Sequence, residues 1–107
     1  MNAVSRLRTR VTLEAPLDVV DETGALQRSW IVVASPWVEL APRKTSGEYV
    51  AAEEGEAILW DVALRWRADI APPMRFRYGA RILAIRAAVD PDARRRTIVC
   101  RCEEFSS

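Results

Sequence analysis

A run of ten residues near the middle of the chain, Ile58 to Arg67, constrains the fold most. Large apolar side chains occupy every second position there: Ile58, Trp60, Val62, Leu64 and Trp66. Successive side chains of a strand leave on opposite faces, so this spacing places all five on one face. A helix would leave two of them on its polar side. The run therefore predicts a β-strand with one face in the core, where each large side chain contributes roughly 1.5–3 kcal/mol on burial. The opposite face would carry Leu59, Asp61, Ala63, Arg65 and Arg67.

Shorter alternating segments on both sides of this run predict further strands. We expect them at residues 7–14, 27–33, 37–40, 74–78, 81–89 and 97–104. Pro16 and Pro42 would end the first and third of these, and Gly79-Ala80 would form a tight hairpin turn. In the first strand we expect Leu7, Val11 and Leu13 to point inward and Arg8, Arg10, Thr12 and Glu14 to point outward.

These segments together predict one all-β domain that spans residues 1–107. Six or seven short strands in a chain of 107 residues are typical of a small antiparallel β-barrel, SH3-like in form, or of a sandwich. Trp30 is expected inside it. Most of the four tryptophans should lie in the core, and one that faced outward would be an interface anchor.

The longest segment without a strand pattern runs from Pro42 to Ala57. Thr45 and Glu48 have the spacing of a capping box, and residues 49–54 would then form one or two helical turns that end at Gly55. Loops of this length in compact domains are usually functional or disordered. We therefore expect the central strand to hold the fold and this loop to carry the function.

The chain lacks most residues that metal and covalent chemistry need. It contains no His, and its two cysteines share one face of the last strand with Ile98, which predicts buried thiols and not zinc ligands. No Ser lies in a nucleophile-elbow context, and no Gly-rich loop could hold a phosphate. Glu53, Glu54 and Glu56 are interpreted as solvated charge. We expect no catalytic residue, no metal and no cofactor.

Charge is balanced overall but separated along the chain. The net charge is +1, which gives no general case for nucleic-acid binding, yet residues 11–61 hold ten acidic and three basic groups and residues 62–101 hold ten basic and three acidic ones. The two halves either face each other within the domain, or an acidic side of one copy meets a basic side of the next in a head-to-tail ring. The candidate interface residues are Arg8, Arg10, Arg65, Arg67, Arg94, Arg95 and Arg96. With no long apolar run, the chain is expected to be soluble, made in the cytosol and unattached to membrane.

Several segments in one order and spacing give the chain a family resemblance. It resembles the head-closure proteins (also called stopper or head–tail joining proteins) of long-tailed bacteriophages and of gene transfer agents. The segments that carry the resemblance are Leu7-Arg8-Thr9-Arg10-Val11-Thr12-Leu13, Ser29-Trp30, Trp37-Val38-Glu39-Leu40, Gly47-Glu48, Leu64-Arg65-Trp66, Pro73-Met74-Arg75-Phe76, Gly79-Ala80-Arg81-Ile82-Leu83-Ala84-Ile85, Val89-Asp90, Arg94-Arg95-Arg96 and Cys100-Arg101-Cys102-Glu103-Glu104.

The resemblance implies a ring of 6 or 12 copies in the connector of a virion or phage-like particle, with the host cytoplasm as its place before assembly. Portal and adaptor proteins would lie above the ring and a tail terminator below it. DNA would pass through the channel without sequence-specific binding. The segment Pro42–Ala57 would reach into this channel, where its net charge of −2 over residues 43–57 would repel the DNA backbone. The channel-loop residues would be Arg43, Lys44, Glu48, Tyr49, Val50, Glu53, Glu54 and Glu56.

Two other classes of function compete with this interpretation. The first is a monomeric SH3- or OB-like module that binds a peptide or single-stranded nucleic acid, and the oligomeric state separates it from a ring component. The second is an enzyme, which the absence of His and of nucleophile motifs disfavours.

Overall fold

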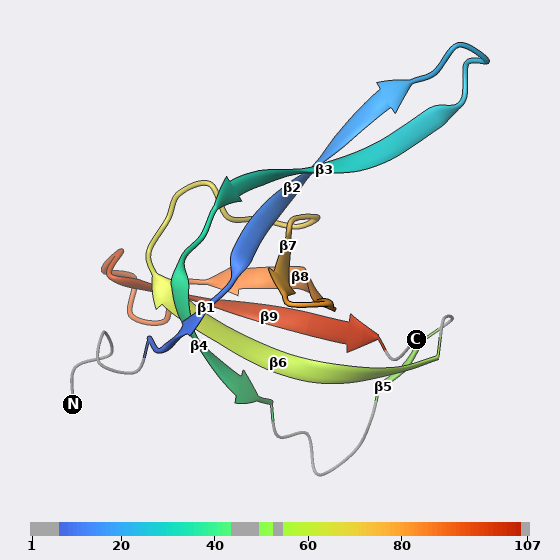
Figure 1. The fold of residues 1–107 in the computed structure, drawn as a ribbon. Coiled ribbons are helices and arrows are strands. Elements are labelled where there is room, and N and C mark those ends of the chain that lie inside the picture. The colour runs from blue at the N-terminus through green and yellow to red at the C-terminus, as the bar shows by residue number, and fades with distance from the viewer. Residues whose placement is uncertain (1–6, 44–49, 53–54, 106–107) are drawn as a thin grey trace.

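The computed structural model describes residues 7–43, 50–52 and 55–105, with the side chains of residues 50–52, 55 and 56 left out of the description. Every regular element in these ranges is a strand (Figure 1). The strands are β1 (Thr9–Arg10), β2 (Thr12–Val20), β3 (Leu26–Ala34), β4 (Trp37–Pro42), β5 (Val50–Ala52), β6 (Gly55–Arg65), β7 (Arg75–Tyr78), β8 (Arg81–Val89) and β9 (Thr97–Phe105).

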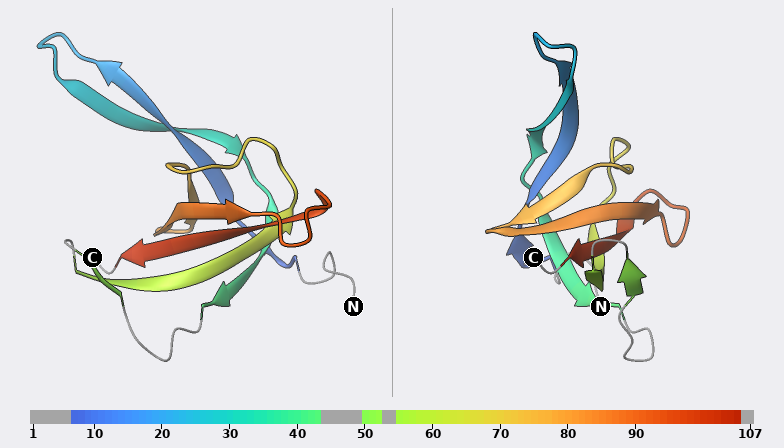
Figure 2. Two further views of the ribbon diagram at one scale, coloured as in Figure 1. Left: turned by 180° about the vertical axis from the view of Figure 1, so that it is seen from behind. Right: turned by 90° about the vertical axis from the view of Figure 1, so that its right-hand side faces the viewer.

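The strands form one antiparallel sheet that curls on itself. Its order is β1-β4-β6-β9-β8-β7-β2-β3, with β5 paired to β6 off this path. Only Val11 separates β1 from β2. Yet Thr9 and Arg10 pair with β4 and residues 12–14 pair with β7. One short segment of chain therefore brings the two ends of the sheet together, which is why the sheet curls into the expected small barrel (Figure 2).

The inner face of the curled sheet forms one apolar core. The period-2 spacing of the sequence explains its membership, since Val62 and Leu64 of β6 and Ile98, Cys100 and Cys102 of β9 are all buried. The largest fully buried side chains are Phe76, Leu13, Leu64, Leu83, Ile85, Val38, Val62 and Cys100.

The outer halves of β2 and β3 leave the barrel as a projecting hairpin (Figures 1 and 2). We call residues 15–33, the projecting hairpin with its base on β3, the arm. Leu13 and Glu14 of β2 pair with β7 on one side and with β3 on the other, but residues 15–20 pair with β3 alone. The tip turns at Gly24, whose φ of +85° is a conformation that glycine adopts without strain.

The arm begins at an irregularity in β2 that coincides with a buried carboxylate. The β2–β3 register shifts between Leu13 and Glu14, and a bulge of this kind bends a strand. Glu14 was predicted to point into solvent but is 5% exposed. Its carboxylate accepts hydrogen bonds from Nε of Arg75 at 2.7 Å and from Nε of Arg77 at 3.1 Å. The Arg75 guanidinium also lies over the Trp30 ring of β3, 3.8 Å from its centroid. The sequence prediction for Glu14 was wrong because two arginines of β7 lie on that face of the sheet.

Other expectations from the sequence need correction. Nine strands are present in the described ranges, and Pro16 does not end the first one, because it lies where only β3 is alongside and an edge position tolerates proline. The helix expected over residues 49–54 is wrong, since Val50–Ala52 is a strand paired with Gly55–Ala57. Thr45 and Glu48 lie outside the described residues. Residues 50–52 form a strand and not a helix because a helix of one or two turns is not stable by itself, whereas pairing with β6 satisfies their backbone hydrogen bonds.

The central strand is confirmed in type but not in every detail. It runs from Gly55 to Arg65, so Trp66 and Arg67 follow it. Trp60 and Trp66 are partly buried against the core, but Ile58 is 38% exposed while Leu59, on the opposite face, is buried. The predicted inward direction is therefore confirmed for Val62 and Leu64 of β6, but it is wrong for Ile58, near the Gly55 end of the strand.

The Glu14 contacts generate a prediction about stability. Glu14→Gln should lower the free energy of unfolding by about 2–3 kcal/mol, because it leaves the mostly buried Arg75 guanidinium without its charged partner. Urea denaturation of the full chain measures this. The matched control is Asp18→Asn, which breaks the exposed pair with Arg28 on the arm and should change stability little. Equal effects of the two variants would contradict the role given to Glu14.

Candidate assembly surfaces

The arm exposes more large apolar side chains than a hairpin surrounded only by solvent would require. Residues opposite each other in an antiparallel pair share a face, and the register places Leu17 with Ser29, Ala15 with Ile31, and Val19 with Gln27 on one face. Four large side chains on this face are between 37% and 50% exposed. We call them the apolar stripe: Leu17, Val19, Ile31 and Val33.

The opposite face of the arm is less continuous. Val20, Leu26 and Val32 are exposed there, but an ion pair between Arg28 and Asp18 interrupts them. The tip itself is acidic, because Asp21 and Glu22 both lie in its turn. Asp21 accepts hydrogen bonds from Thr23 Oγ1 and Gln27 Nε2, which lower the pKa of this carboxyl most. The backbone N–H groups of Ala25 and Thr23 also donate to it and lower the pKa further.

A groove lies at the other end of the barrel, between the start of β4 and the end of β6. It has a volume of about 330 Å³ and contains two tryptophans, of which Trp37 is 51% exposed. Trp37 is thus the outward-facing tryptophan that the sequence analysis associated with an interface. We call this the tryptophan groove; its lining residues are Leu7, Pro36, Trp37, Leu64, Arg65, Trp66 and Arg67.

Most of the arginines predicted for an interface gather around the tryptophan groove. Arg65 and Arg67 line it, and Arg10 lies over the Trp37 ring at 5.5 Å. Arg95 lies over the Trp66 ring at 5.6 Å, and the backbone N–H of Trp66 donates to the Arg96 carbonyl at 3.1 Å. The residue 90–96 turn is therefore held against the groove, so Arg94 is carried there by its neighbours in the chain. Arg8 is exposed near the start of the described chain.

Not all of these cations are available for a partner. Arg67 pairs with Asp69 at 2.9 Å, and Arg96 pairs with Asp92 at 2.6 Å. Arg65 and Arg94 form no side-chain ion pair within the described ranges. These two carry the charge that could meet a carboxylate of another molecule.

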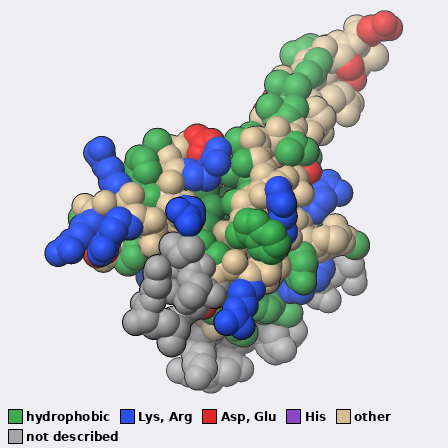
Figure 3. Space-filling view, turned by 60° about the vertical axis from the view of Figure 1, so that its left-hand side comes forward, with side chains coloured by type: hydrophobic (Ala, Val, Ile, Leu, Met, Phe, Trp, Pro, Cys, Tyr) green, Lys and Arg blue, Asp and Glu red, His purple; other side chains and the backbone are tan. Residues whose placement is uncertain are grey.

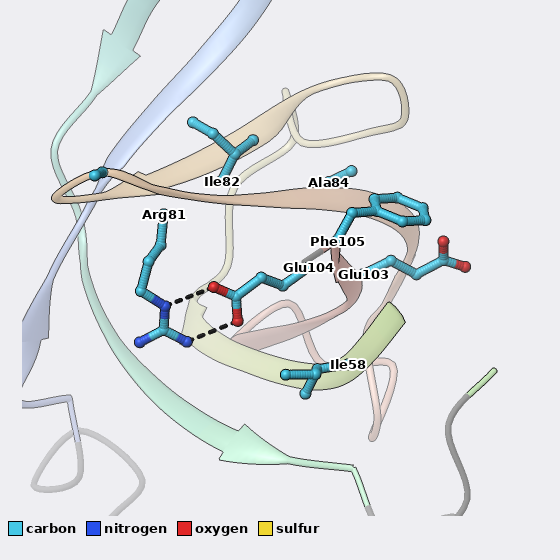
Figure 4. Close-up of a pocket in the computed structure, with 8 residues that line it drawn as sticks. Ile58, Arg81, Ile82, Ala84, Glu103, Glu104 and Phe105 are labelled. Atoms are coloured by element: carbon cyan, nitrogen blue, oxygen red, sulfur yellow. Dashed lines mark hydrogen bonds and ion pairs between the residues drawn. The ribbon is translucent and has the colours of Figure 1, made fainter. Parts of the chain in front are cut away.

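A second groove lies between β6, β8 and β9 (Figure 4). Its floor holds an ion pair in which Nε and Nη2 of Arg81 donate to the two oxygens of Glu104 at 2.6 and 2.8 Å. Trp60 Nε1 also donates to Glu104 at 3.0 Å. Apolar atoms of Ile58 and Phe105 lie at its edge, as Figure 4 shows. Since its carboxylate is already satisfied, this groove offers an apolar contact surface and not a reactive group.

The structure describes few of the predicted channel-loop residues. Arg43 follows β4, and its backbone N–H donates to the Leu59 carbonyl at 3.0 Å. The backbones of Val50 and Glu56 lie in the β5–β6 hairpin, which is below the arm in the view of Figure 1. Lys44, Glu48, Tyr49, Glu53 and Glu54 lie outside the described residues.

Within the described ranges the side chains offer contact surfaces and no reactive centre. Cys100 and Cys102 are buried as predicted, and burial raises the pKa of the Cys100 thiol to about 12. No group of three or more His, Cys, Asp or Glu residues in this part of the chain could hold a metal ion. The search for a helix able to span a membrane found none there.

The apolar stripe is what sequence reasoning missed. Residues 17–20 were interpreted partly as a polar turn, because Asp18, Asp21 and Glu22 surround Val19 and Val20. The available signal was the alternation of Leu17 and Val19 with Asp18, facing Ile31 and Val33 across a Gly24 turn. It indicates a hairpin, but not that the hairpin projects from the domain.

A small β-barrel with exposed apolar and charged surfaces at two ends defines a structural protein that works through contacts with other proteins. Comparison with known families makes this specific. The chain matches the family of the phage head completion protein over residues 3–104, and it belongs to that family. This is a structural family and not an enzyme family, and its role is head completion.

Solved structures agree with the family. A chain from the virion of a native gene transfer agent particle has a TM-score of 0.76 at 25% identity, over 95% of this chain and 98% of that one. Protein SF1141 from Shigella flexneri 2a, known from a solution structure, has a TM-score of 0.74 at 24% identity, over 100% of this chain and 99% of that one, and this likeness shows the fold. No curated protein matches the sequence.

The Arg81–Glu104 pair generates a prediction about pH. The hydrogen bonds from Arg81 hold the pKa of the Glu104 carboxyl below its ordinary value of 4.5. A carboxyl whose pKa is lower in the folded state stabilises the fold at higher pH, and this contribution disappears as the pH falls through the lowered pKa. We expect Glu104→Gln to cost about 1 kcal/mol at neutral pH, because Arg81 remains partly exposed, and the difference from the unchanged chain to shrink below pH 4.5.

Urea titrations from pH 3 to pH 7 measure this difference. The control introduces Glu104→Gln into a chain that already carries Arg81→Gln, where it should have a much smaller effect. A Glu104→Gln effect that grew in acid would contradict the assignment.

Proposed function

We propose that this protein forms a ring in the connector between the head and the tail of a phage or gene transfer agent particle. The ring closes the DNA-filled head and presents a surface on which the tail docks. Membership of the head completion family and the likeness to a chain of a gene transfer agent virion support this proposal. They also support a place for this protein in the virion. Before assembly, its proposed place is the host cytoplasm.

The observation that carries the proposal is the amount of apolar surface left exposed. Most of the exposed large hydrophobic side chains lie on the arm, and others lie at each of the two grooves. Monomeric proteins rarely expose contiguous apolar surface of this kind, and larger patches mark interaction sites. A domain of 107 residues with several such surfaces is suited to contact several neighbours at once.

These neighbours are further copies of the same chain within the ring, portal or adaptor proteins on the head side, and a tail terminator on the tail side. Copies number 6 or 12 in the ring, in keeping with the symmetry of a closed head-to-tail arrangement. DNA passes through without sequence-specific contacts, which the net charge of +1 favours over a strongly basic channel.

The segment from Pro42 to Ala57 is the part of the chain that reaches the channel. Its net charge of −2 over residues 43–57 opposes binding to DNA phosphates, so retention of DNA is steric. The β5–β6 hairpin supports this role, because it holds the end of the segment at the opposite end of β6 from the tryptophan groove.

Particles that lack this protein test the proposal. We expect electron micrographs to show heads that have lost their DNA and carry no tails, with full tailed particles restored when the chain is supplied from a plasmid. The monomeric binding module, which is the alternative function, predicts full and tailed particles without it. That outcome would overturn the connector role.

Charge reversal in the channel segment tests its placement. Replacing Glu53, Glu54 and Glu56 by Lys should slow DNA ejection severalfold, because the added cations would hold the phosphate backbone. The matched control replaces the same three residues by Gln, which removes their negative charge but adds no cation that could hold the phosphate backbone. Ejection kinetics that do not differ between the two triple variants would contradict a channel position.

A further inference from the structure

The arm and the tryptophan groove are complementary in chemistry and lie at different ends of one molecule. The molecule measures 54 × 31 × 25 Å, and the arm extends along its length (Figures 1 and 2). The arm presents aliphatic side chains, and the groove presents two tryptophan rings with the aliphatic Leu7 and Leu64 beside them. Apolar groups as large as leucine and valine fit a groove of about 330 Å³.

Acidic and basic side chains are also separated between the arm and the tryptophan groove. The arm holds Asp18, Asp21 and Glu22 against Arg28 as its one cation, so it is acidic, most strongly at its tip. The groove and the adjoining turn are basic, with Arg65 and Arg94 unpaired by any other described side chain. Figure 3 shows acidic side chains at the end of the arm and basic side chains gathered on the opposite side of the molecule.

From these two observations we propose that the apolar stripe of one copy docks into the tryptophan groove of a second copy of this chain. In this arrangement the acidic tip meets the basic turn at residues 90–96. The inference rests on the proposed ring and deepens it, since it names the surfaces through which neighbouring copies join.

Geometry excludes docking within one copy. The arm leaves the barrel in the direction away from the groove, as the two views in Figure 2 agree. Its base is fixed by the pairing of residues 12–14 with β7 and by the contacts of Glu14 with Arg75 and Arg77. An arm held in this way reaches the groove of another copy but not its own.

The contact that results is of the kind that closes into a ring. Two different surfaces meet, so each copy uses its arm on one neighbour and its groove on the other, and such heterologous contacts form rings when the rotation closes. Trp37 is suited to anchor the contact, because exposed tryptophans carry a large share of binding energy when a partner covers them. The charges at the tip and the turn would guide the encounter and fix the register.

The stripe face is favoured over the opposite face of the arm. The opposite face carries the Asp18–Arg28 pair and, near its base, the Trp30 ring covered by Arg75. Burial of the exposed Asp18–Arg28 pair would remove both charges from water, which is costly. On the face that carries the apolar stripe, the only polar residues in the paired part of the arm are Ser29 and Gln27. This face carries no charge there and can be buried at lower cost.

Photo-crosslinking maps the occupant directly. A benzophenone amino acid replaces Val19 in the full chain, and assembled particles are irradiated and analysed by mass spectrometry. We expect crosslinks from position 19 to a second copy of this chain, in peptides that contain Trp37 or Trp66. The matched control places the same amino acid at Arg28, on the opposite face of the arm, and should give at least fivefold less of this product.

A second variant checks the groove. Trp37→Ser, which changes an exposed side chain and should leave the unfolding transition of the chain nearly unchanged, should reduce the crosslink from position 19 at least fivefold. Crosslinks from position 19 to a portal, adaptor or tail protein, or none to this chain in particles that contain it, would overturn the inference and leave the connector role standing. Absence of the chain from particles would instead overturn the connector role.

Discussion

The direction of the arm depends on one buried carboxylate. Glu14 lies where β2 leaves the barrel, and it accepts hydrogen bonds from two arginines of β7. One of these arginines also lies over Trp30 of β3. The three strands at the base of the arm are thus tied together by side chains as well as by their backbones. Beyond residue 14, β2 and β3 form a two-stranded ribbon. Such a ribbon is at best marginally stable in water by itself, so the contacts at its base help to hold it in place.

A rigid arm gives a small domain a reach that its barrel does not have. The barrel supplies a core of fully buried side chains and needs no metal or disulfide in the described part of the chain. The arm and the grooves then supply surfaces on different sides of this core. The proposed ring would hold its neighbours in fixed positions, and strands suit such a role better than loops would.

Much of the barrel could be predicted from the sequence because its strands follow the simple period of two. The strand at residues 81–89 and the turn at Gly79-Ala80 are found where expected, and the burial of Cys100 and Cys102 is confirmed. The sequence predictions were wrong where contacts between residues far apart in the chain determine the local structure. Pro16 remains in a strand because its outer edge is unpaired, and Glu14 is buried because Arg75 and Arg77 come from 61 and 63 residues away.

The candidate surfaces were predictable only in part. Arginines at residues 10, 65, 67 and 94–96 were assigned to an interface from charge alone, and the fold gathers them beside Trp37 and Trp66. The apolar stripe was not foreseen, because local sequence does not show that a hairpin extends beyond its sheet. The segment at residues 44–49, on which the channel prediction mainly rests, is not described.

The central claim is that copies of this chain join one another through the arm and surround the path of the DNA. A cryo-electron microscopy reconstruction of the neck of intact particles tests it most directly. The account predicts a closed ring of this chain between the portal side and the tail, with each arm lying across the next copy at Trp37. A neck in which this chain is absent, or in which the arms contact only other proteins, would contradict it.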